Sequence, residues 1–511
     1  MYLLGAGPGD PELITVRAAR RLAEADLVLY DALVHPDLLA HVRPGAELVF
    51  VGKRAGRASE RQHAINERLI EAARAGRVVA RLKGGDPFLF GRGSEEAEAL
   101  AAAGIEMEIV PGVPSPTAAA EYAGFSLTHR DASSSVAFVT ATESADKDRT
   151  SHDWSKLATG PQTLVIFMGA RKLASLMQLL VDHGRSPATP AVVVEWASLP
   201  RQRVVEGTVA DIAERAQAAG IGLPALTVVG EVVALRRALR WFDTKPMFGK
   251  RVLVTRPADR ADELARMLRD EGAEPVRMPA IAIAPPEDPA PLERAVRELD
   301  AYAWVVITSA TGASALFAEI ARQGRDARAL GAAKVCAIGP ATAAKLASYG
   351  VRADLVPEEF RGEAVASAIL ARHPEGLAGR RILLPRAAVA RDVVPDTLRA
   401  NGALVDVVPA YRNVSPGDAQ RAELARAIRE GAVDVVTLTA PSTLSSVCEA
   451  LGDDAASVLA GLTVASIGPI TTAAAEKAGV RVDVSAREYT AVGLVESLVE
   501  HFRAREGASP R

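Results

Sequence analysis

The sequence has very little cysteine and no long apolar run, and both absences narrow what the protein can be. Only Cys336 and Cys448 occur in 511 residues, both in apolar surroundings, so neither a disulfide framework nor a thiolate metal site is expected. No apolar stretch reaches membrane-spanning length, and Met1 leads straight into a predicted strand without a basic, apolar leader. The sequence therefore predicts a cytoplasmic protein with no metal, no membrane partner and no export signal.

The chain also lacks an excess of either charge sign. It has 60 Lys and Arg residues and 63 Asp and Glu residues, which gives a net charge of -3. This balance argues against nucleic acid as a partner, although local basic clusters can still meet an acidic ligand. Because 49% of the residues are hydrophobic, a chain of this length is expected to form several packed domains.

Residues 81–93, RLKGGDPFLFGRG, connect a predicted strand to a helix with Ser94 as its expected N-cap. Gly84 and Gly85 permit positive φ and let a ligand approach the backbone closely. Asp86 is the only acid within this loop. Its carboxylate suits a ribose hydroxyl or a cation, and the alternative is a tight turn in which it caps a helix.

Matching turns lie on either side of this loop. The chain opens with GAGPGDPELIT at 5–15, which is not a dinucleotide fingerprint, because Asp10 stands where GxGxxG needs glycine. Pro8 also removes an N–H group that would hold a pyrophosphate. VPGVPS at 110–115 is another strand-to-helix turn, and LTHRD at 127–131 follows the next helix. The order and spacing of these motifs are specific, whereas each motif alone is weak.

Together with VLYD at 28–31, VGKRAG at 51–56 and VIFMG at 165–169, these motifs resemble uroporphyrinogen III C-methyltransferase, of the tetrapyrrole methylase class. The resemblance covers residues 1 to about 240. It implies two α/β lobes with S-adenosylmethionine bound in the cleft between them. It also implies methyl transfer to C2 and C7 of uroporphyrinogen III, which gives precorrin-2, and a homodimer that forms through this half of the chain.

Asp31 and Lys53 follow predicted strands, at the edge where open α/β sheets bind ligands. From the residues alone, Asp31 also fits a turn position and Lys53 a solvated charge. The resemblance implies a proton acceptor for Asp31 and a proton donor for Lys53, and methylation of a pyrrole carbon does require a proton to leave elsewhere on the macrocycle. Arg92 and Arg130 lie inside motifs and are predicted to hold substrate carboxylates.

The resemblance also implies which residues contact the cofactor. They are Pro8, Gly84, Gly85, Asp86, Leu89, Pro114, Ser115, Met168, Ala197 and Ala225. The chain departs from the family at one point, since Thr-Ser or Thr-Ala is common where Pro114 and Ser115 stand. The hydroxyl expected at the first of these positions is missing, so only backbone contacts are carried over there.

Residues 241–250, WFDTKPMFGK, interrupt the alternating pattern and indicate a domain boundary. Beyond it the sequence contains an internal echo: VCAIGPATA at 335–343 recurs as VASIGPITT at 464–472, and each copy is followed by GVR. Two copies are too few for a solenoid. They predict two similar α/β lobes facing one another across a cleft, each with a Gly-Pro-x-Thr turn whose N–H groups can hold carboxylates.

This second half is similar to uroporphyrinogen III synthase. The similarity is carried by VTRP at 254–257, ITSATG at 307–312, AIGPAT at 337–342, LLPRA at 383–387, AYR at 410–412, LTAPST at 438–443 and SIGPITT at 466–472. It implies that hydroxymethylbilane loses its hydroxyl and closes to uroporphyrinogen III with inversion of ring D, without a cofactor. Tyr411 is the candidate proton donor to the departing hydroxyl, and the alternative is a core tyrosine between the lobes.

Several hydroxyl side chains in the same motifs are candidates for contact with the bilane. They are Thr308, Ser309, Thr342, Thr439, Ser442 and Thr471. The alternative for each is a helix cap, because Ser and Thr in such turns commonly accept backbone N–H groups.

The predicted fold class is α/β, with a two-lobed methylase fold followed by a two-lobed synthase module. The methylase is expected over 1–243, with lobes of about 1–125 and 126–240, and the linker over 244–249. The synthase is expected over 250–505, with lobes of about 250–283 plus 412–505, and 284–411.

Three hypotheses remain open. The chain is a bifunctional enzyme acting on tetrapyrroles, or a methylase for a different acceptor, or a protein in which one half binds a tetrapyrrole without catalysis. The synthase-like half argues against the second hypothesis. Incubation with hydroxymethylbilane, with and without S-adenosylmethionine, distinguishes all three.

Overall fold

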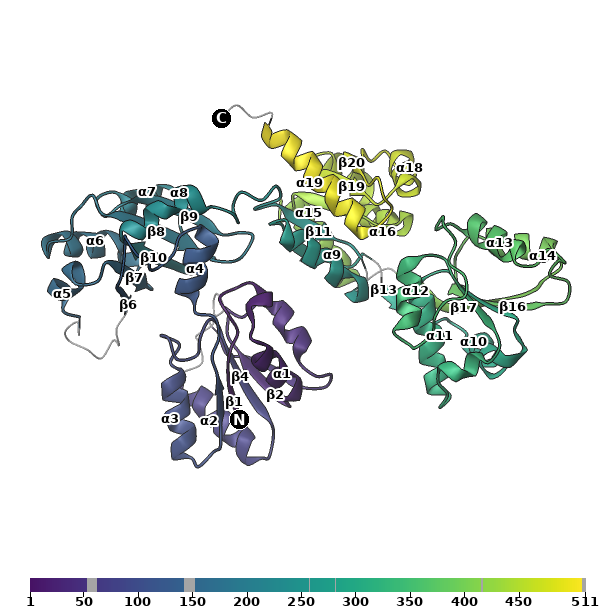
Figure 1. Ribbon diagram of the computed structural model, residues 1–511, viewed down its shortest axis with the longest axis horizontal. Coiled ribbons are helices and arrows are strands. Elements are labelled where there is room, and N and C mark those ends of the chain that lie inside the picture. The colour runs from purple at the N-terminus through teal and green to yellow at the C-terminus, as the bar shows by residue number, and fades with distance from the viewer. Residues whose placement is uncertain (53–61, 142–151, 257, 281, 415–416, 508–511) are drawn as a thin grey trace. The chain divides into compact units, whose positions relative to one another are not determined.

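The computed structural model describes every residue except 53–61, 142–151, 257, 281, 415–416 and 508–511. The described residues form four five-stranded sheets, each accompanied by helices (Figure 1). The predicted α/β class is therefore confirmed. Among the described residues, no helix has both the length and the apolar character that crossing a membrane requires.

The first sheet has the strand order β3–β2–β4–β1–β5, and all neighbouring strands are parallel. Its strands are β1 (Tyr2–Gly5), β2 (Leu27–Tyr30), β3 (Glu47–Phe50), β4 (Val79–Lys83) and β5 (Glu108–Val110). The accompanying helices are α1 (Val16–Glu24), α2 (Gln62–Arg74) and α3 (Gly93–Ala102), whereas α4 (Ser115–Ala123), which follows β5, packs against the second sheet. Because the strands are parallel, their carboxyl ends and the loops that follow them share one edge, where α/β sheets bind ligands.

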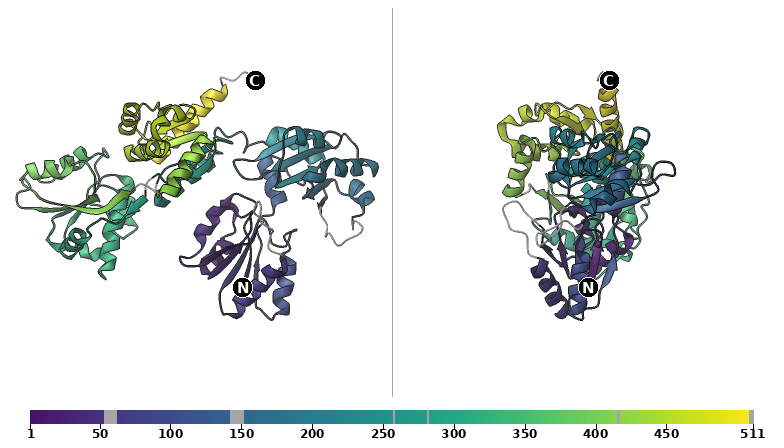
Figure 2. Two further views of the ribbon diagram at one scale, coloured as in Figure 1. Left: turned by 180° about the vertical axis from the view of Figure 1, so that it is seen from behind. Right: turned by 90° about the vertical axis from the view of Figure 1, so that its left-hand side faces the viewer.

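The helices cover this sheet on both faces (Figures 1 and 2). Helix α1 is capped by Thr15, whose Oγ1 accepts the Ala18 N–H, and it buries Ala18 and Leu22, which lie one turn apart, on one face. Helices α2 and α3 bury Leu69 and Leu100 against the other face. Helices thus cover both faces of the sheet, as is usual for parallel sheets.

The N-terminus of α3 differs from the prediction. Ser94 was expected to cap the helix, but the helix begins at Gly93 and its N-cap is Arg92, which has a φ of 60°. The Gly93 N–H donates to the Pro87 carbonyl at 2.9 Å, so the loop folds back and enters the helix earlier. A left-handed arginine at this position has no signature in the sequence.

The second sheet has the order β6–β7–β10–β8–β9 and mixes parallel and antiparallel pairs. Its strands are β6 (Val136–Thr140), β7 (Thr163–Phe167), β8 (Pro190–Glu195), β9 (Arg203–Thr208) and β10 (Ala225–Val229). The helices of this region are α5 (Trp154–Thr159), α6 (Leu173–Asp182), α7 (Ile212–Ala218) and α8 (Arg236–Leu239). Strands β7, β8 and β10 are almost continuously apolar and buried, because both of their faces pack against other elements.

The third sheet has the order β12–β11–β18–β19–β20. Its strands are β11 (Arg251–Val254), β12 (Glu274–Arg277), β18 (Val435–Leu438), β19 (Thr463–Ser466) and β20 (Val484–Ser485). The helices of the same segments are α9 (Ala258–Asp270), α15 (Asp418–Arg429), α16 (Pro441–Leu451), α17 (Ala455–Leu459), α18 (Pro469–Lys477) and α19 (Ala491–Gly507).

The fourth sheet has the order β13–β17–β16–β14–β15, with β13 antiparallel to β17 and the other pairs parallel. Its strands are β13 (Ala282–Ala284), β14 (Trp304–Ile307), β15 (Lys334–Ala337), β16 (Arg381–Ala387) and β17 (Leu404–Val414). Its helices are α10 (Ala290–Arg297), α11 (Ala310–Arg322), α12 (Pro340–Ala347), α13 (Gly362–Ala371) and α14 (Val393–Ala400).

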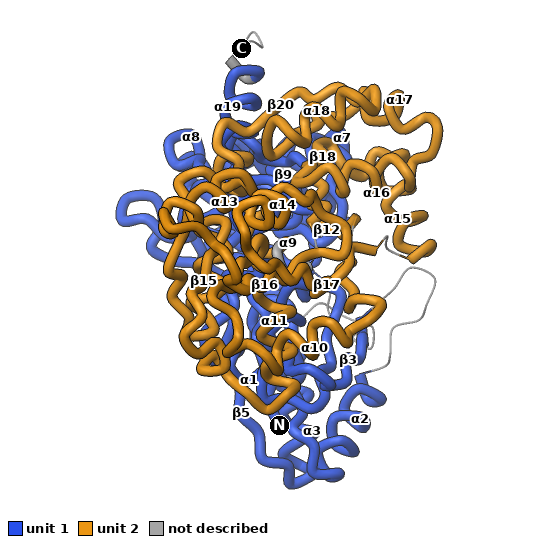
Figure 3. Tube along the Cα trace, turned by 90° about the vertical axis from the view of Figure 1, so that its right-hand side faces the viewer, with its two compact units in different colours: residues 1–252, 265–275, 495–511 blue, residues 253–264, 276–494 orange. Residues whose placement is uncertain are grey.

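The described chain divides into two compact units (Figure 3). The first comprises Met1–Val252, Ala265–Pro275 and Val495–Arg511, and the second comprises Leu253–Leu264 and Val276–Leu494. The module and lobe boundaries expected from the sequence, including the linker at 244–249, stay predictions.

Candidate active site

Three loops at the carboxyl edge of the first sheet touch one another through their backbones. A Cβ atom on Gly5 would lie 2.4 Å from the Gly112 nitrogen and 2.8 Å from the Gly85 carbonyl oxygen. A Cβ atom on Gly112 would lie 2.3 Å from the same oxygen. Gly7 and Gly85 exchange backbone hydrogen bonds of 3.2 and 2.7 Å. No larger residue fits at Gly5 or Gly112, so glycine at these two positions is a packing requirement.

A cavity of about 520 Å³ opens beside this junction, and its wall includes residues from both of the first two sheets and their loops. Its volume is within the usual range for a small-molecule site. Most of the residues predicted to contact the cofactor line it, namely Pro8, Gly84, Gly85, Ser115, Met168, Ala197 and Ala225. The rest of the wall is largely apolar and includes Leu33, Phe167, Leu199 and Leu223.

Asp86, Leu89 and Pro114 are not part of this wall. One oxygen of the Asp86 carboxylate accepts the N–H groups of Phe88 and Leu89 at 2.8 and 3.1 Å, and the other accepts the Gly112 N–H at 3.1 Å. Asp86 therefore holds its own loop in shape and ties it to the turn that follows β5. The structure brings Asp86 to the junction but turns its carboxylate toward backbone groups.

Two residues with strained backbone line the same cavity. Positive φ angles between 49° and 67° occur at Phe90, Arg92, Met168, Trp196 and Ser198, and these are the non-glycine residues of the described chain with this conformation. Each such residue costs on the order of 1–3 kcal/mol, which the surrounding structure must offset. Met168 and Trp196 line the cavity itself. Trp196 and Ser198 were not predicted as site residues, because nothing in their sequence context indicates positive φ.

Contacts join the loops after β1 and β8, which both contribute residues to the cavity wall. The Asp10 N–H donates to Ser198 Oγ at 3.0 Å, and the Tyr122 hydroxyl donates to the Asp10 carboxylate at 3.1 Å. Burial, followed by the nearby Asp10 charge, raises the pKa of Tyr122, so the phenol stays protonated and remains a donor. This arrangement could not be predicted from the sequence, since Asp10 and Ser198 are far apart along the chain.

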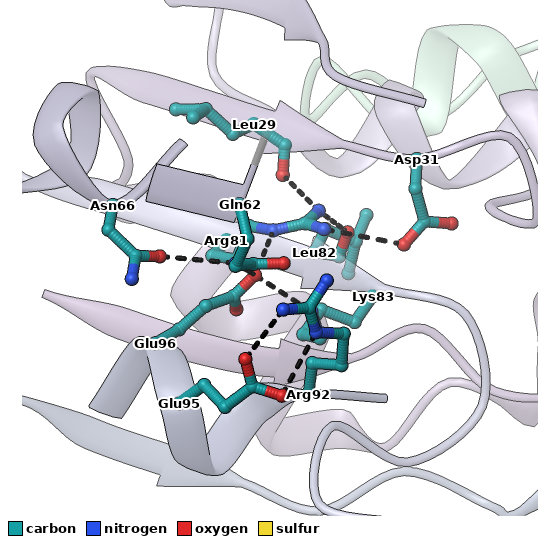
Figure 4. A network of polar contacts seen from close by, with 10 residues as sticks. All are labelled: Leu29, Asp31, Gln62, Asn66, Arg81, Leu82, Lys83, Arg92, Glu95 and Glu96. Carbon is teal, nitrogen blue, oxygen red and sulfur yellow. Dashed lines mark hydrogen bonds and ion pairs between the residues drawn. The ribbon is translucent and has the colours of Figure 1, made fainter. Parts of the chain in front are cut away.

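A buried network of charges lies beneath the loop after β4 (Figure 4). Glu96 is fully buried, and its Oε1 is 2.9 Å from Lys83 Nζ and 3.3 Å from Arg81 Nε. Arg81 also donates to the carbonyls of Leu29 and Leu82 at 3.3 and 2.9 Å. Burial, followed by the positive charge of Arg81, lowers the pKa of Lys83. One carboxylate thus offsets two buried cations, which are expensive to bury alone.

This network reaches Asp31, the predicted proton acceptor. Arg81 Nη2 is 3.6 Å from Asp31 Oδ2, while Asp31 Oδ1 accepts the Leu33 N–H at 3.0 Å. The Asp31 side chain keeps 25% of its surface exposed, so its carboxylate is open to a ligand. Lys53, the predicted proton donor, lies outside the described residues.

The two arginines predicted to hold substrate are exposed. Arg92 forms a two-point pair with Glu95 at 2.9 and 2.6 Å, on a surface where such pairs are weak. Arg130 lies in the exposed turn after α4. Neither lines the cavity of about 520 Å³. Their role with substrate stays a prediction.

In the second half of the chain, Tyr411 on β17 is brought to Ser309. The Tyr411 and Ser309 hydroxyl oxygens are 3.0 Å apart, and Ser309 Oγ also accepts the Gly312 N–H at 2.9 Å as the N-cap of α11. Since that bond uses an acceptor site of Ser309, its hydroxyl hydrogen is available for Tyr411. Tyr411 and Thr311 line a mostly apolar cavity of about 820 Å³.

The other predicted substrate hydroxyls lie in varied surroundings. Thr308 and Thr439 directly follow strands β14 and β18 and are half-buried, while Ser442 is exposed on α16. Thr342 and Thr471 are only 4% and 3% exposed, inside the first turns of α12 and α18. Of the predicted hydroxyl residues, Ser309 therefore contacts Tyr411, whereas Thr342 and Thr471 are buried.

Both halves of the chain match known protein families. The family described as Tetrapyrrole (Corrin/Porphyrin) Methylases matches residues 1–213, and Uroporphyrinogen-III synthase HemD matches residues 262–496. The porphyrin biosynthesis protein HemD of Ruminiclostridium josui is 36% identical over 498 residues, which cover 98% of this chain and 97% of that protein.

Further relatives match the first half alone or with part of the second. Uroporphyrinogen-III C-methyltransferase of Bacillus subtilis is 39% identical over 330 residues, which cover 65% of this chain and 68% of that protein. The solved uroporphyrin-III C-methyl transferase of Thermus thermophilus, complexed with S-adenyl homocysteine, is 41% identical, with coverage of 46% and 98% and a TM-score of 0.40. The chain spans about half the length of the siroheme synthases that it matches.

We expect Glu96→Gln to loosen β4 and α3 at a cost of about 3–5 kcal/mol, because it leaves Lys83 buried without its carboxylate partner and Arg81 with only the more distant Asp31. Hydrogen exchange of the amides in β4 and α3 measures this loss as faster local opening. The control is Glu95→Gln, which removes only an exposed pair on the same helix and should cost less than about 1 kcal/mol. Equal protection in both variants would show that the network does not stabilise the loop.

Proposed function

Because the chain belongs to the family of porphyrin biosynthesis proteins that join a tetrapyrrole methylase module to a uroporphyrinogen-III synthase HemD module, we propose that it carries out two successive reactions. The synthase half cyclises hydroxymethylbilane to uroporphyrinogen III with inversion of ring D. The methylase half then transfers methyl groups from S-adenosylmethionine to C2 and C7 and gives precorrin-2. The names of the siroheme synthase relatives favour the siroheme branch for this product.

The observation that carries the proposal is the cavity beside the three-glycine junction. A Cβ atom on Gly85 would meet nothing closer than the Ser115 nitrogen, at 3.8 Å, so the open space belongs to the cavity and not to packing. A bare backbone of this kind suits close contact with a ligand, and the apolar wall suits an adenine ring and a thioether chain. The residues present therefore fit S-adenosylmethionine, which supplies an electrophilic methyl group when bound.

Pro8, Gly84, Gly85 and Ser115 would hold the cofactor from the first lobe, and the second-lobe residues Met168, Ala197 and Ala225 would hold it from the other. Asp86 contributes by fixing the loop that carries the two glycines. Leu89 and Pro114 remain proposed contacts from the same two loops.

Asp31 is the proposed proton acceptor. A carboxylate that is partly exposed, and held by one backbone N–H, can take the proton that leaves the macrocycle after methylation. Arg81 lies on the buried side of this carboxylate and orients it toward solvent. We also propose Lys53 as proton donor, and Arg92 and Arg130 as carboxylate contacts, on the strength of the family motifs.

In the synthase half, Tyr411 is the proposed donor to the departing hydroxyl. Donation of its proton leaves a phenolate, and the Ser309 hydroxyl can donate a hydrogen bond to that oxygen. The proposed substrate contacts are Thr308, Thr342, Thr439, Ser442 and Thr471, of which Thr342 and Thr471 can contribute only through their turns. No cofactor is proposed for this half.

The organisation of the chain is part of the proposal. We place the methylase at 1–243, the linker at 244–249 and the synthase at 250–505, and we propose a cytoplasmic homodimer formed through the methylase. Two tethered active sites raise the local concentration of the intermediate that the first releases and the second consumes.

Asp86→Ala should weaken S-adenosylmethionine binding by about tenfold or more, because the N–H groups of Phe88, Leu89 and Gly112 lose their shared acceptor and the loop relaxes. Calorimetry with S-adenosylmethionine measures the change, and synthase activity of the same sample should be unaffected. Glu98→Ala, an exposed acid on α3, serves as the matched control. An unchanged affinity in a folded Asp86→Ala variant would refute the role.

Asp31→Asn should slow methyl transfer by about a hundredfold or more while largely preserving cofactor affinity, since the amide cannot accept a proton. Single-turnover formation of methylated product from supplied uroporphyrinogen III is the measurement. Near-normal turnover in this variant would return Asp31 to the role of a turn residue.

Tyr411→Phe should slow ring closure and raise the share of uroporphyrinogen I, which forms spontaneously when hydroxymethylbilane escapes uncyclised. Ser309→Ala should shift the isomer ratio in the same direction, because the phenolate loses a hydrogen-bond donor. Chromatographic separation of the isomers measures both effects. The control is Tyr302→Phe, which removes a hydroxyl bonded to Asp406 elsewhere on the same sheet. An isomer ratio like wild type in Tyr411→Phe would leave that residue only a packing role.

A further inference from the structure

The internal echo of the second half extends to an aromatic residue that neither family motif includes. Phe360 and Tyr489 each lie 21 residues beyond the glycine of a Gly-Pro turn, from 339 to 360 and from 468 to 489. A Cβ atom on Gly339 would lie 3.0 Å from the Phe360 ring, and one on Gly468 would lie 2.7 Å from the Tyr489 ring. Each ring therefore rests directly on its glycine.

The backbone around each ring is built in the same way. The Arg361 N–H donates to the Glu359 carbonyl at 3.0 Å, and the Thr490 N–H donates to the Glu488 carbonyl at 2.8 Å. Phe360 and Tyr489 are thus each the central residue of a three-residue turn. These turns lead into helices α13 and α19 (Figure 1). The repeated turn fixes the direction of each ring.

The strand before each ring is anchored alike as well. Asp354 accepts the Val335 N–H at 2.7 Å, and Asp483 accepts the Val464 N–H at 3.0 Å. Both carboxylates tie the returning chain to the strand that begins the repeat, β15 or β19. The placement of both rings at the carboxyl ends of these strands is therefore a property of the repeated unit.

The two rings are much more exposed than core aromatic residues. Phe360 keeps 54% and Tyr489 65% of its surface exposed, although one side of each ring covers a glycine. Ile470, two residues beyond Gly468, and Val492, three residues beyond Tyr489, are 63% and 48% exposed. Packing on the glycine explains why each ring is held, but it does not explain the open surface, which costs free energy in water.

We propose that Phe360 and Tyr489 are substrate-contacting residues of the synthase half, each presenting an aromatic surface to a pyrrole ring of the linear tetrapyrrole. The inference rests on the proposed synthase function and adds two specificity residues to it. Pyrroles are flat and electron-rich, so they pair with an aromatic side chain by offset stacking or edge-to-face contact. The exposed rings of Phe360 and Tyr489 can stack on the pyrroles of the substrate. The hydroxyl groups of the motifs cannot make this contact.

The test uses Phe360→Ala and Tyr489→Ala in the full chain, with hydroxymethylbilane as substrate. Each variant should raise KM by about tenfold, the loss expected for one aromatic contact, with a smaller change in kcat. The share of uroporphyrinogen I should rise, because the bilane escapes more often. Leu404→Ala is the control. Leu404 is 56% exposed but lies at the amino end of β17, whereas the two rings lie beyond the carboxyl ends of β15 and β19.

Phe360→Leu and Tyr489→Leu separate binding from packing, because leucine still covers the glycine but has no flat π surface. KM should stay raised in the leucine variants while their thermal unfolding matches wild type. KM and isomer shares within twofold of wild type in all four variants would overturn the inference, as would full rescue by leucine. Absence of synthase activity in the wild-type chain would instead overturn the proposed function.

Discussion

The whole candidate methylase site depends on one steric constraint, the meeting of three backbones at Gly5, Gly85 and Gly112. Since Gly5 and Gly112 leave no room for a side chain, the loops after β1, β4 and β5 lie close enough for Gly7 and Gly85 to share hydrogen bonds. The carboxylate of Asp86 then completes the junction by accepting N–H groups from two of these loops. Gly7, Gly84 and Gly85 bring this part of the main chain to the cavity wall.

Residues with positive φ and a buried group of charges lie next to this junction. Met168 and Trp196 both have positive φ and both line the cavity. Below the loop after β4, Glu96 pairs with Arg81 and Lys83, and all three side chains are buried. Both features lower stability locally, and both lie where a ligand would gain from a preorganised surface.

The sequence was sufficient for the α/β class and for the position of seven of the seventeen residues that line the cavity, because glycine-rich turns after apolar strands have few structural solutions. It was insufficient wherever the partner lies far along the chain. The bond between Ser309 and Tyr411 spans 102 positions, and the Asp86 to Gly112 bond spans 26. The burial of Thr342 and Thr471 was missed for another reason: a motif shows that a hydroxyl is present, whereas the helix decides which way it points.

The two copies of the repeated unit have similar backbone conformations, but some of their exposed side chains differ. Phe360 in one corresponds to Tyr489 in the other, and Ala341 corresponds to Ile470. A linear molecule of four similar rings is nearly the same when read in a shifted register or from the opposite end. A fully symmetric protein could not tell these registers apart. Under the proposed synthase function, discrimination between the rings must therefore come from the positions at which the two copies have diverged.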